Sequence, residues 1–238
     1  MLILALDTSA TTATVALLED GVSVGAFHIY NKLTHSEKLL PMIDSLLTFV
    51  KKTIDDINLI AVSSGPGSFT GVRIGVSCVK GLALSRDIPI ASVSTLEALA
   101  NNFLLFAPKK MKRVIICPCM DARRDELYSA IFSFDGEKVE RLSGDMAVSC
   151  QDLSSKLSEY DASVYLLGDG GEKMYKFLDE EKPAFKFYSV PTVMCMQNAQ
   201  SVGMVGYKKF LQNETVTAEK LVCTYLRQSQ AERNYKGE

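Results

Sequence analysis

The hydrophobic pattern at the start of the chain predicts three short strands and then a helix. Apolar runs cover Leu2–Leu6, Ala13–Leu18 and Val22–Tyr30, and the turn residues Glu19-Asp20-Gly21 separate the last two. Apolar residues then recur three and four positions apart, which is the spacing of an amphipathic helix. This spacing predicts a helix from about Ser36 to Lys51.

Strands and helices continue to alternate after this helix. We expect strands at Leu59–Ser63 and Pro89–Val93, a helix from Phe69 to about Ser85, and another from Ser94 to about Phe106. The next segment, Pro108–Arg113, is short, basic and proline-bearing, which is typical of a crossing between two lobes.

This crossing divides the chain into a first lobe at residues 1–107 and a second at residues 108–238. The tail after about residue 213 can pack back on the first lobe.

The second half of the chain repeats the order of the first. Asp121 ends a strand at Val114–Met120, just as Asp7 ends the first strand, and a polar turn leads into a second strand in both halves. Asp7 and Gly21 are 14 positions apart, and Asp121 and Gly136 are 15 apart. We interpret the chain as a duplicated lobe, although one hairpin pattern can resemble another by chance. The other elements expected in the second half are a strand near Leu127–Phe134, a third strand after Asp135-Gly136, a helix near Gln151–Tyr160, a strand at Val164–Leu167, a helix after Gly168–Gly171, a strand near Phe185–Tyr188 and a helix over about Met196–Leu211.

Composition narrows the class of protein. The chain has 238 residues, 47% of them hydrophobic, and 28 acidic residues against 26 basic ones. The hydrophobic content excludes general disorder, and the near balance of acidic and basic residues excludes a broad basic surface for nucleic acid. No apolar run approaches the roughly 18 residues that span a bilayer, and the start of the chain lacks the basic leader of a signal peptide. We therefore expect a cytoplasmic protein with reduced thiols at its six cysteines, and its two histidines, His28 and His35, limit the catalytic options.

The segment Val62–Gly75 combines a strand end, a glycine loop and a helix start. Its glycines permit positive φ and close backbone approach, and the free N–H groups of the helix turn suit an anion. The spacing fits neither a Walker loop nor a nucleophile elbow. The alternative is a tight turn with close packing, which we favour for Gly71, Gly75 and Gly81. The candidate ligand loop comprises Asp7, Thr8, Ser9, Gly65, Gly67 and Ser68.

Two lobes that each open with a strand meander and an aspartate in the first turn resemble the actin, hexokinase and heat-shock-chaperone superfamily. The resemblance implies an α/β fold of two similar lobes, each a mixed sheet flanked by helices, with ATP bound between the lobes in active relatives. A shared fold does not confer that function. Asp7 and Asp121 also suit a simpler role, because short carboxylates begin turns well, and we favour that role.

Seven motifs, in order along the chain, resemble the TsaB (YeaZ) family, a bacterial partner in making threonylcarbamoyladenosine in tRNA. The resemblance runs from the first strand to residue 227. It departs from the family pattern at Thr224, where many relatives have proline, and the course of the tail is therefore open. The motifs are Ile3–Ser9, His35–Pro41, Gly65–Gly75, Lys80–Ala83, Ser94–Ala98, Asp121–Arg124 and Tyr225–Arg227.

The resemblance implies a scaffold rather than an enzyme. The catalytic paralogue, TsaD, binds a metal through two histidines one helical turn apart, and Thr95 and Leu99 stand at those positions here. Leucine cannot bind a metal, so we expect no metal centre, no catalytic residue and no cofactor of its own, with ATP or ADP at most at the interface of a complex. The alternatives are an independent peptidase or nucleotide hydrolase, and a homodimeric binding module with its own nucleotide.

The implied partners are TsaD, a TsaE-type ATPase subunit, a second copy of the chain, and tRNA through the complex, with no membrane. In the family, the helix after Ser36 and the glycine-bearing helix form the dimerisation surface, so a homodimer and a heterodimer would compete for it. The expected partner-binding residues are His35, Leu39, Leu40, Ile43, Leu46, Leu47, Phe69, Gly71, Val72, Gly75, Cys78 and Val79. Candidate tRNA contacts are Lys109, Lys110, Lys112 and Arg113, beside Arg123 and Arg124, although a solvated charged surface is the interpretation we favour for them.

Overall fold

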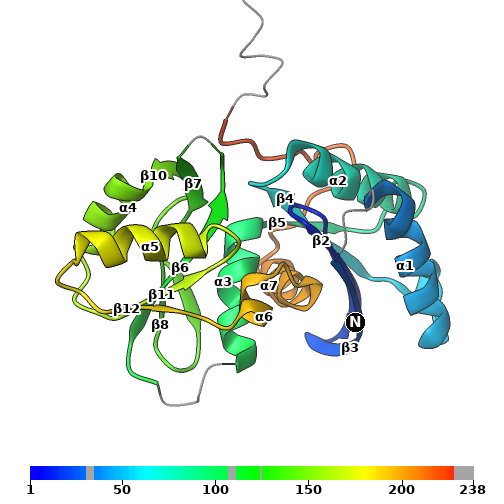
Figure 1. Cartoon of the computed structure of the whole chain (residues 1–238). Coiled ribbons are helices and arrows are strands. Elements are labelled where there is room, and N and C mark those ends of the chain that lie inside the picture. The colour runs from blue at the N-terminus through cyan, green and yellow to red at the C-terminus, as the bar shows by residue number, and fades with distance from the viewer. Residues whose placement is uncertain (31–34, 107–110, 124, 228–238) are drawn as a thin grey trace, which may run out of the picture.

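The computed structural model shows two α/β lobes side by side and describes residues 1–30, 35–106, 111–123 and 125–227 (Figure 1). Lys109, Lys110 and Arg124 lie outside these described residues. Within them, no helix is long and apolar enough to cross a membrane.

The first lobe is built on a mixed five-stranded sheet in the order β3-β2-β1-β4-β5. β1 pairs antiparallel with β2 and parallel with β4, which places it at the centre of the sheet. Leu2, Leu4 and Leu6 face α1 and α2, whereas Ile3 and Ala5 face α7 on the other side. The bounds are β1 Leu2–Asp7, β2 Thr12–Glu19, β3 Val22–Tyr30, α1 His35–Phe49, a short 3-10 helix Ile54–Asp56, β4 Leu59–Gly65, α2 Phe69–Leu84, β5 Ile90–Ser94 and α3 Thr95–Phe106.

The second lobe repeats this topology. Its main strands lie in the order β10-β7-β6-β11-β12, with β6 paired antiparallel to β7 and parallel to β11. The same strand order in both sheets confirms the duplication predicted from the sequence. The bounds are β6 Val114–Asp121, β7 Glu126–Ser129, β8 Phe132–Phe134, β9 Val139–Arg141, β10 Met146–Ser149, α4 Cys150–Leu157, β11 Val164–Leu167, α5 Gly171–Glu181, β12 Phe187–Ser189, α6 Thr192–Cys195 and α7 Ala199–Leu211.

The last helix of each repeat packs on the sheet of the other lobe. In α3, Leu96, Leu99 and Phe103 lie in the core that contains β6 and β8 of the second lobe. In α7, Val202 and Val205 lie in the core formed with β1 and β4 of the first lobe. α3 and α7 also contact each other between the two sheets (Figure 1). The sequence-based division at residue 107 therefore does not separate two independently packed units.

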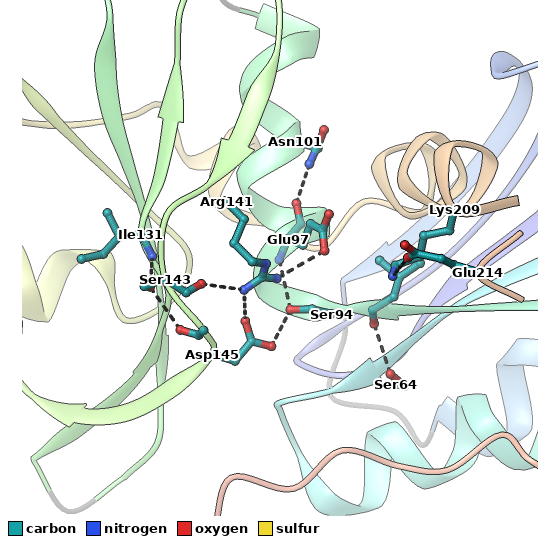
Figure 2. A network of polar contacts seen from close by, with 12 residues as sticks. Ser64, Ser94, Glu97, Asn101, Ile131, Arg141, Ser143, Asp145, Lys209 and Glu214 are labelled. Carbon is teal, nitrogen blue, oxygen red and sulfur yellow. Dashed lines mark hydrogen bonds and ion pairs between the residues drawn. The ribbon is translucent and has the colours of Figure 1, made fainter. Parts of the chain in front are cut away.

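A polar network joins the lobes beside these helices (Figure 2). The Arg141 guanidinium, from β9, donates to the Asp145 carboxylate at 2.6 Å and pairs with Glu97 of α3 at 3.3 Å. The Ser94 hydroxyl, at the end of β5, donates to the other oxygen of Asp145 at 2.6 Å. Arg141 also lies over the Phe132 ring at 4.7 Å, so the β9–β10 loop is held against α3.

The structure corrects two predicted elements. The single strand expected near Leu127–Phe134 is two strands, β7 and β8, interrupted at Ala130 and Ile131, where the Ile131 N–H donates to the Ser143 hydroxyl. The last helix begins at Ala199 rather than Met196, since the Asn198 side chain caps it by accepting from the Gln200 N–H.

Candidate functional site

The first turn of the first lobe is closed around Asp7. The Asp7 carboxylate accepts from the Ser9 N–H at 2.7 Å, the Ser9 hydroxyl at 2.6 Å and the Ser63 hydroxyl at 2.5 Å. Its side chain is buried, and burial raises the pKa of Asp7 although these hydrogen bonds lower it. The carboxylate thus holds its own turn together, in agreement with the turn-forming role favoured from the sequence.

The glycine loop packs against this same turn. The Ser68 N–H donates to the Ser9 carbonyl at 2.7 Å, and the Thr8 hydroxyl donates to the Gly71 carbonyl at 2.7 Å. A Cβ on Gly67 would lie 2.5 Å from the Ser9 carbonyl oxygen, and one on Gly71 would lie 2.0 Å from that of Thr8. The candidate ligand loop is therefore filled by contacts of the chain with itself.

Close packing explains Gly71 and Gly75, as predicted from the sequence, but it does not explain Gly81. A Cβ on Gly75 would lie 2.6 Å from the Thr8 hydroxyl oxygen, so both Gly71 and Gly75 allow α2 to approach the first turn. Nothing lies within 4 Å of a Cβ placed on Gly81, which faces open space. Because Gly71 and Gly75 face the chain's own turn, they are unsuited to the partner contact expected of them.

The corresponding turn of the second lobe is open. The Asp121 carboxylate accepts from the Arg123 N–H at 3.0 Å, but its side chain is 51% exposed. The Asp121 N–H donates to the Asp169 carboxylate at 3.2 Å, and burial raises the pKa of Asp169. Lys173 lies 4.0 Å from Asp121 and is the nearest cation paired with it among the described residues.

The two positions matched to the metal-binding histidines are buried. Thr95 has no exposed surface and Leu99 is 1% exposed in the core beneath α3. The Thr95 hydroxyl is buried and has no hydrogen-bond partner. Among the described residues, no three His, Cys, Asp or Glu side chains are grouped to hold a metal ion.

A cavity of about 500 Å³ lies between the lobes. Thr11 and Thr12 line it from the first lobe, and Asp169, Glu172 and Gln197 line it from the second. Its lining, as far as the chain is described, contains no lysine, arginine or histidine. The charged side chains of this lining, as far as the chain is described, are the carboxylates of Asp169 and Glu172.

A second cavity, of about 450 Å³, lies on the surface between α1 and α2, and we call it the α1–α2 groove. Leu40 is 54% exposed at its edge. All six cysteines are free, and one of them, Cys78, lines the groove. The lining residues are Ser36, Leu39, Leu40, Thr70, Arg73, Ile74, Ser77 and Cys78.

Half of the expected partner-binding residues are buried in the chain's own core, although Leu39 among them also lines the groove. They have at most 7% of their surface exposed because they pack against the first sheet. His35 Nε2 donates to the Ala10 carbonyl at 2.7 Å and so ties the start of α1 to the first turn. Phe69 stacks on Tyr225 of the tail. The buried residues are Leu39, Ile43, Leu46, Leu47, Val72 and Val79.

The groove also contains residues that the sequence analysis missed. Counted from Thr70, the residues Arg73, Ile74 and Ser77 lie three, four and seven positions further along α2. This spacing places them on one helical face, beside Cys78. The helical spacing of Thr70, Arg73, Ile74 and Ser77 could therefore have predicted the outward face of α2 from the sequence, whereas Gly71 and Gly75 mark its inward face.

The tail takes a defined course at the position that departs from the family pattern. The Thr224 N–H donates to the Ser64 carbonyl at 2.7 Å, beside Gly65, whose φ is +122°. Proline has no N–H and could not make this bond. Thr224 therefore anchors the tail on the glycine loop. Lys112 and Arg113 are exposed just before β6, where they stay candidate tRNA contacts.

Sequence comparisons match the chain to named protein families. The family profile "TsaD: tRNA N6-adenosine threonylcarbamoyltransferase" matches residues 31–235. The "tRNA threonylcarbamoyladenosine biosynthesis protein TsaB" of Bacillus subtilis is 34% identical over 232 residues, covering 98% of this chain and 96% of that protein. The protein of the same name in Escherichia coli is 38% identical over 135 residues, which cover 57% of this chain and 56% of that protein.

Solved structures give the same result. YeaZ from Pseudomonas aeruginosa is 25% identical and matches with a TM-score of 0.79, covering 94% of this chain and 99% of that one. The ROK hexokinase from Thermus thermophilus, 10% identical, matches with a TM-score of 0.50 over 89% of this chain and all of its own, which confirms the predicted two-lobed fold class. By sequence, motif order and fold, the chain belongs to the TsaB (YeaZ) family.

Proposed function

We propose that this chain acts in tRNA threonylcarbamoyladenosine biosynthesis as a non-catalytic scaffold that binds and activates the catalytic paralogue TsaD. The relatives named TsaB support the pathway. The α1–α2 groove is the observation that supports the scaffold role, because it is an open apolar surface on the helix pair that the family resemblance implies.

The chemistry of the groove suits a protein partner. Leu40 and Ile74 offer apolar contact, and burying an exposed leucine side chain contributes about 1–2 kcal/mol. Arg73 supplies a cation at the rim, where an acidic or carbonyl group of a partner can accept from it. A surface of this kind favours one orientation of the partner, since the apolar contact and the charge are side by side.

The other members of the complex follow from the same proposal. A second copy of the chain competes with TsaD for the groove, and a TsaE-type ATPase acts on the assembled pair in the cytoplasm. ATP or ADP binds at a subunit interface of the complex. Lys112 and Arg113 are the described basic residues that would contact tRNA phosphates within the complex.

A reconstituted modification assay tests the proposal. It contains TsaD, the ATPase subunit, the threonylcarbamoyl-adenylate donor and tRNA, with and without this chain, and modified adenosine is measured by mass spectrometry of tRNA digests. We expect product only when this chain and TsaD are both present. Product made by this chain without TsaD would instead support the independent-enzyme alternative.

A surface substitution locates the contact. Leu40→Glu places a charge where the partner packs, and we expect binding to TsaD and product formation to fall about 10-fold or more. Leu211→Glu is the matched control, because Leu211 is 63% exposed at the end of α7 and lies outside the groove. Leu39→Glu is unsuitable because Leu39 is only 1% exposed and its substitution would disrupt the core. Equal activity of the Leu40→Glu and Leu211→Glu variants would exclude this groove as the binding surface.

A further inference from the structure

Three motifs that are distant in the sequence meet at one segment of the tail. Residues 224–227 contact the glycine motif at one end and the turn after Asp121 at the other. We call these four residues the strap. Neither the fold class nor the proposed partner groove accounts for the Tyr225–Arg227 and Asp121–Arg124 motifs, so their contact calls for a separate explanation.

The first-lobe end of the strap lies against α2. A Cβ on Gly65 would be 2.2 Å from the Thr224 carbonyl oxygen, so only glycine lets the strap lie this close. The Tyr225 ring stacks on Phe69 with a centroid distance of 4.4 Å and an interplanar angle of 8°. Arg73 Nε donates to the Tyr225 hydroxyl at 2.8 Å, and the guanidinium lies 5.6 Å from the Tyr225 centroid.

The second-lobe end of the strap lies on the open turn. Leu226 packs against the core beneath α3. Arg227 Nη1 donates to the Ala122 carbonyl at 2.8 Å, and Arg227 forms an ion pair with Glu126. The Arg227 side chain is only 18% exposed, so this contact is partly shielded from water. One residue, Leu226, therefore separates a side chain held by α2 from one held by the second lobe.

We propose that the strap couples the α1–α2 groove to the second-lobe turn, with Arg73 as the residue through which the bound partner acts. Arg73 lines the groove and also holds Tyr225, so a partner group that accepts from its guanidinium draws it away from the tyrosine hydroxyl. Tyr225 is then held less firmly on α2, and through Leu226 the hold of Arg227 on the turn weakens. The part of this proposal that concerns the bound partner rests on the proposed function, whereas the coupling within the chain does not.

The physical basis is the short distance along the chain between two side-chain anchors. Backbone freedom gained at Tyr225 is passed to Arg227, because one intervening residue provides few dihedral angles to absorb it. Coupling between sites is reciprocal in free energy, so loosening the turn also weakens the hold on Arg73. An occupied groove is thus detectable on the other lobe.

Amide hydrogen exchange of the isolated full chain tests the coupling. The Ala122 N–H donates to the Glu126 carbonyl and the Glu126 N–H to the Arg123 carbonyl, so both amides report on opening of the turn. We expect Arg73→Ala, Tyr225→Ala and Arg227→Ala each to raise exchange at these amides about 2- to 10-fold, the effect of losing one hydrogen bond. Tyr225→Phe keeps the ring and removes the hydroxyl, so its effect is smaller.

Val222→Ala is the matched control. Val222 is 67% exposed in the same tail segment, and we expect its substitution to leave the turn amides unchanged. Circular dichroism checks that each variant is folded. If the Tyr225→Ala variant does not fold, the Tyr225→Phe variant still tests the coupling. If Arg73→Ala and Tyr225→Phe both match Val222→Ala, the coupling is refuted.

A second measurement adds TsaD at saturating concentration, with binding followed by size-exclusion chromatography. In the wild-type chain, the bound paralogue should raise exchange at the Ala122 and Glu126 amides, and it should cause no further rise in the Arg73→Ala variant. Binding without a change at these amides refutes the partner's part of the proposal. Failure to bind refutes the proposed function and that part together, while the isolated-chain result still decides whether the strap couples the lobes.

Discussion

The first turns of the two lobes share one hydrogen-bonding pattern, but the aspartate of the first turn is buried and that of the second is exposed to solvent. Asp7 accepts from the N–H two residues later, and Asp121 does the same. Asp7 is 1% exposed, whereas the side chain of Asp121 is 51% exposed. Duplication thus preserved the turn, because an aspartate that accepts from its own backbone needs no neighbours. The difference in burial between the Asp7 and Asp121 side chains depends instead on the segments that pack over each turn.

The segment after the fourth main strand makes the difference. In the first lobe, Gly67 and Gly71 bring the loop and the start of α2 within contact of Thr8 and Ser9, which closes the turn. In the second lobe the loop also approaches closely, since a Cβ on Gly170 would lie 3.1 Å from the Asp121 nitrogen, but a Cβ on Gly171, at the start of α5, would have 3.7 Å to its nearest neighbour. The first turn became part of the core, and the second stayed available to Lys173 and to the strap.

The largest expected effect comes from filling the close contact. Gly71→Ala would place a Cβ 2.0 Å from the Thr8 carbonyl oxygen, and we expect it to lower the free energy of unfolding by about 3 kcal/mol or more. Gly171→Ala has room and should be neutral or stabilising by up to about 1 kcal/mol. Urea denaturation measures both, and similar losses at the two glycines would contradict the comparison.

Removing each aspartate gives the next largest contrast. Asp7→Ala leaves the buried donors of Ser9 and Ser63 without an acceptor, which we expect to cost about 2–4 kcal/mol. Asp121→Ala loses one exposed hydrogen bond and a weak ion pair with Lys173, for about 0.5 kcal/mol. Denaturation midpoints at constant pH test this order, and a larger loss at Asp121 would reverse our interpretation of the two turns.

The smallest expected effect is a dependence on pH that comes from Asp7. Burial raises the pKa of Asp7 above its ordinary value of 3.8, so the folded chain keeps this proton to a higher pH than the unfolded chain. The contribution of Asp7 to the free energy of unfolding therefore falls as pH rises from 3.8 through the folded pKa. Asp7→Asn carries no such proton, so its stability relative to wild type should rise over this window and then level off.

Ser63→Ala sharpens this measurement. The Ser63 hydroxyl donates to Asp7 and lowers the pKa of Asp7 in the folded chain, so its loss should extend the upper end of the window to higher pH. Stability is compared by urea titration at successive pH values, always as a difference from the wild-type chain. A stability difference between Asp7→Asn and wild type that stays flat across this range would show that Asp7 titrates alike in both states.

Much of the fold could be predicted from local pattern. The strands that end at Asp7 and at Asp121 were correctly placed in matching positions of two repeats. This was possible because strand and helix periods are local properties of sequence. The close approach at Gly71 was also predictable, since a residue without a Cβ marks a backbone contact. The outward face of α1 was not predictable: Leu39 and Leu40 are equally apolar, yet one is 1% exposed and the other 54%.

The sequence by itself determined the order of the elements, the duplication and the family, because each is written in residue types and their spacing along the chain. Only the tertiary structure decided that α3 and α7 each pack on the sheet of the other lobe and that Gly71 faces Thr8. It also decided that Tyr225 and Arg227 join α2 to the turn after Asp121. Amphipathic spacing specifies that a face is buried, whereas the neighbour that buries it is chosen by how all the elements pack at once.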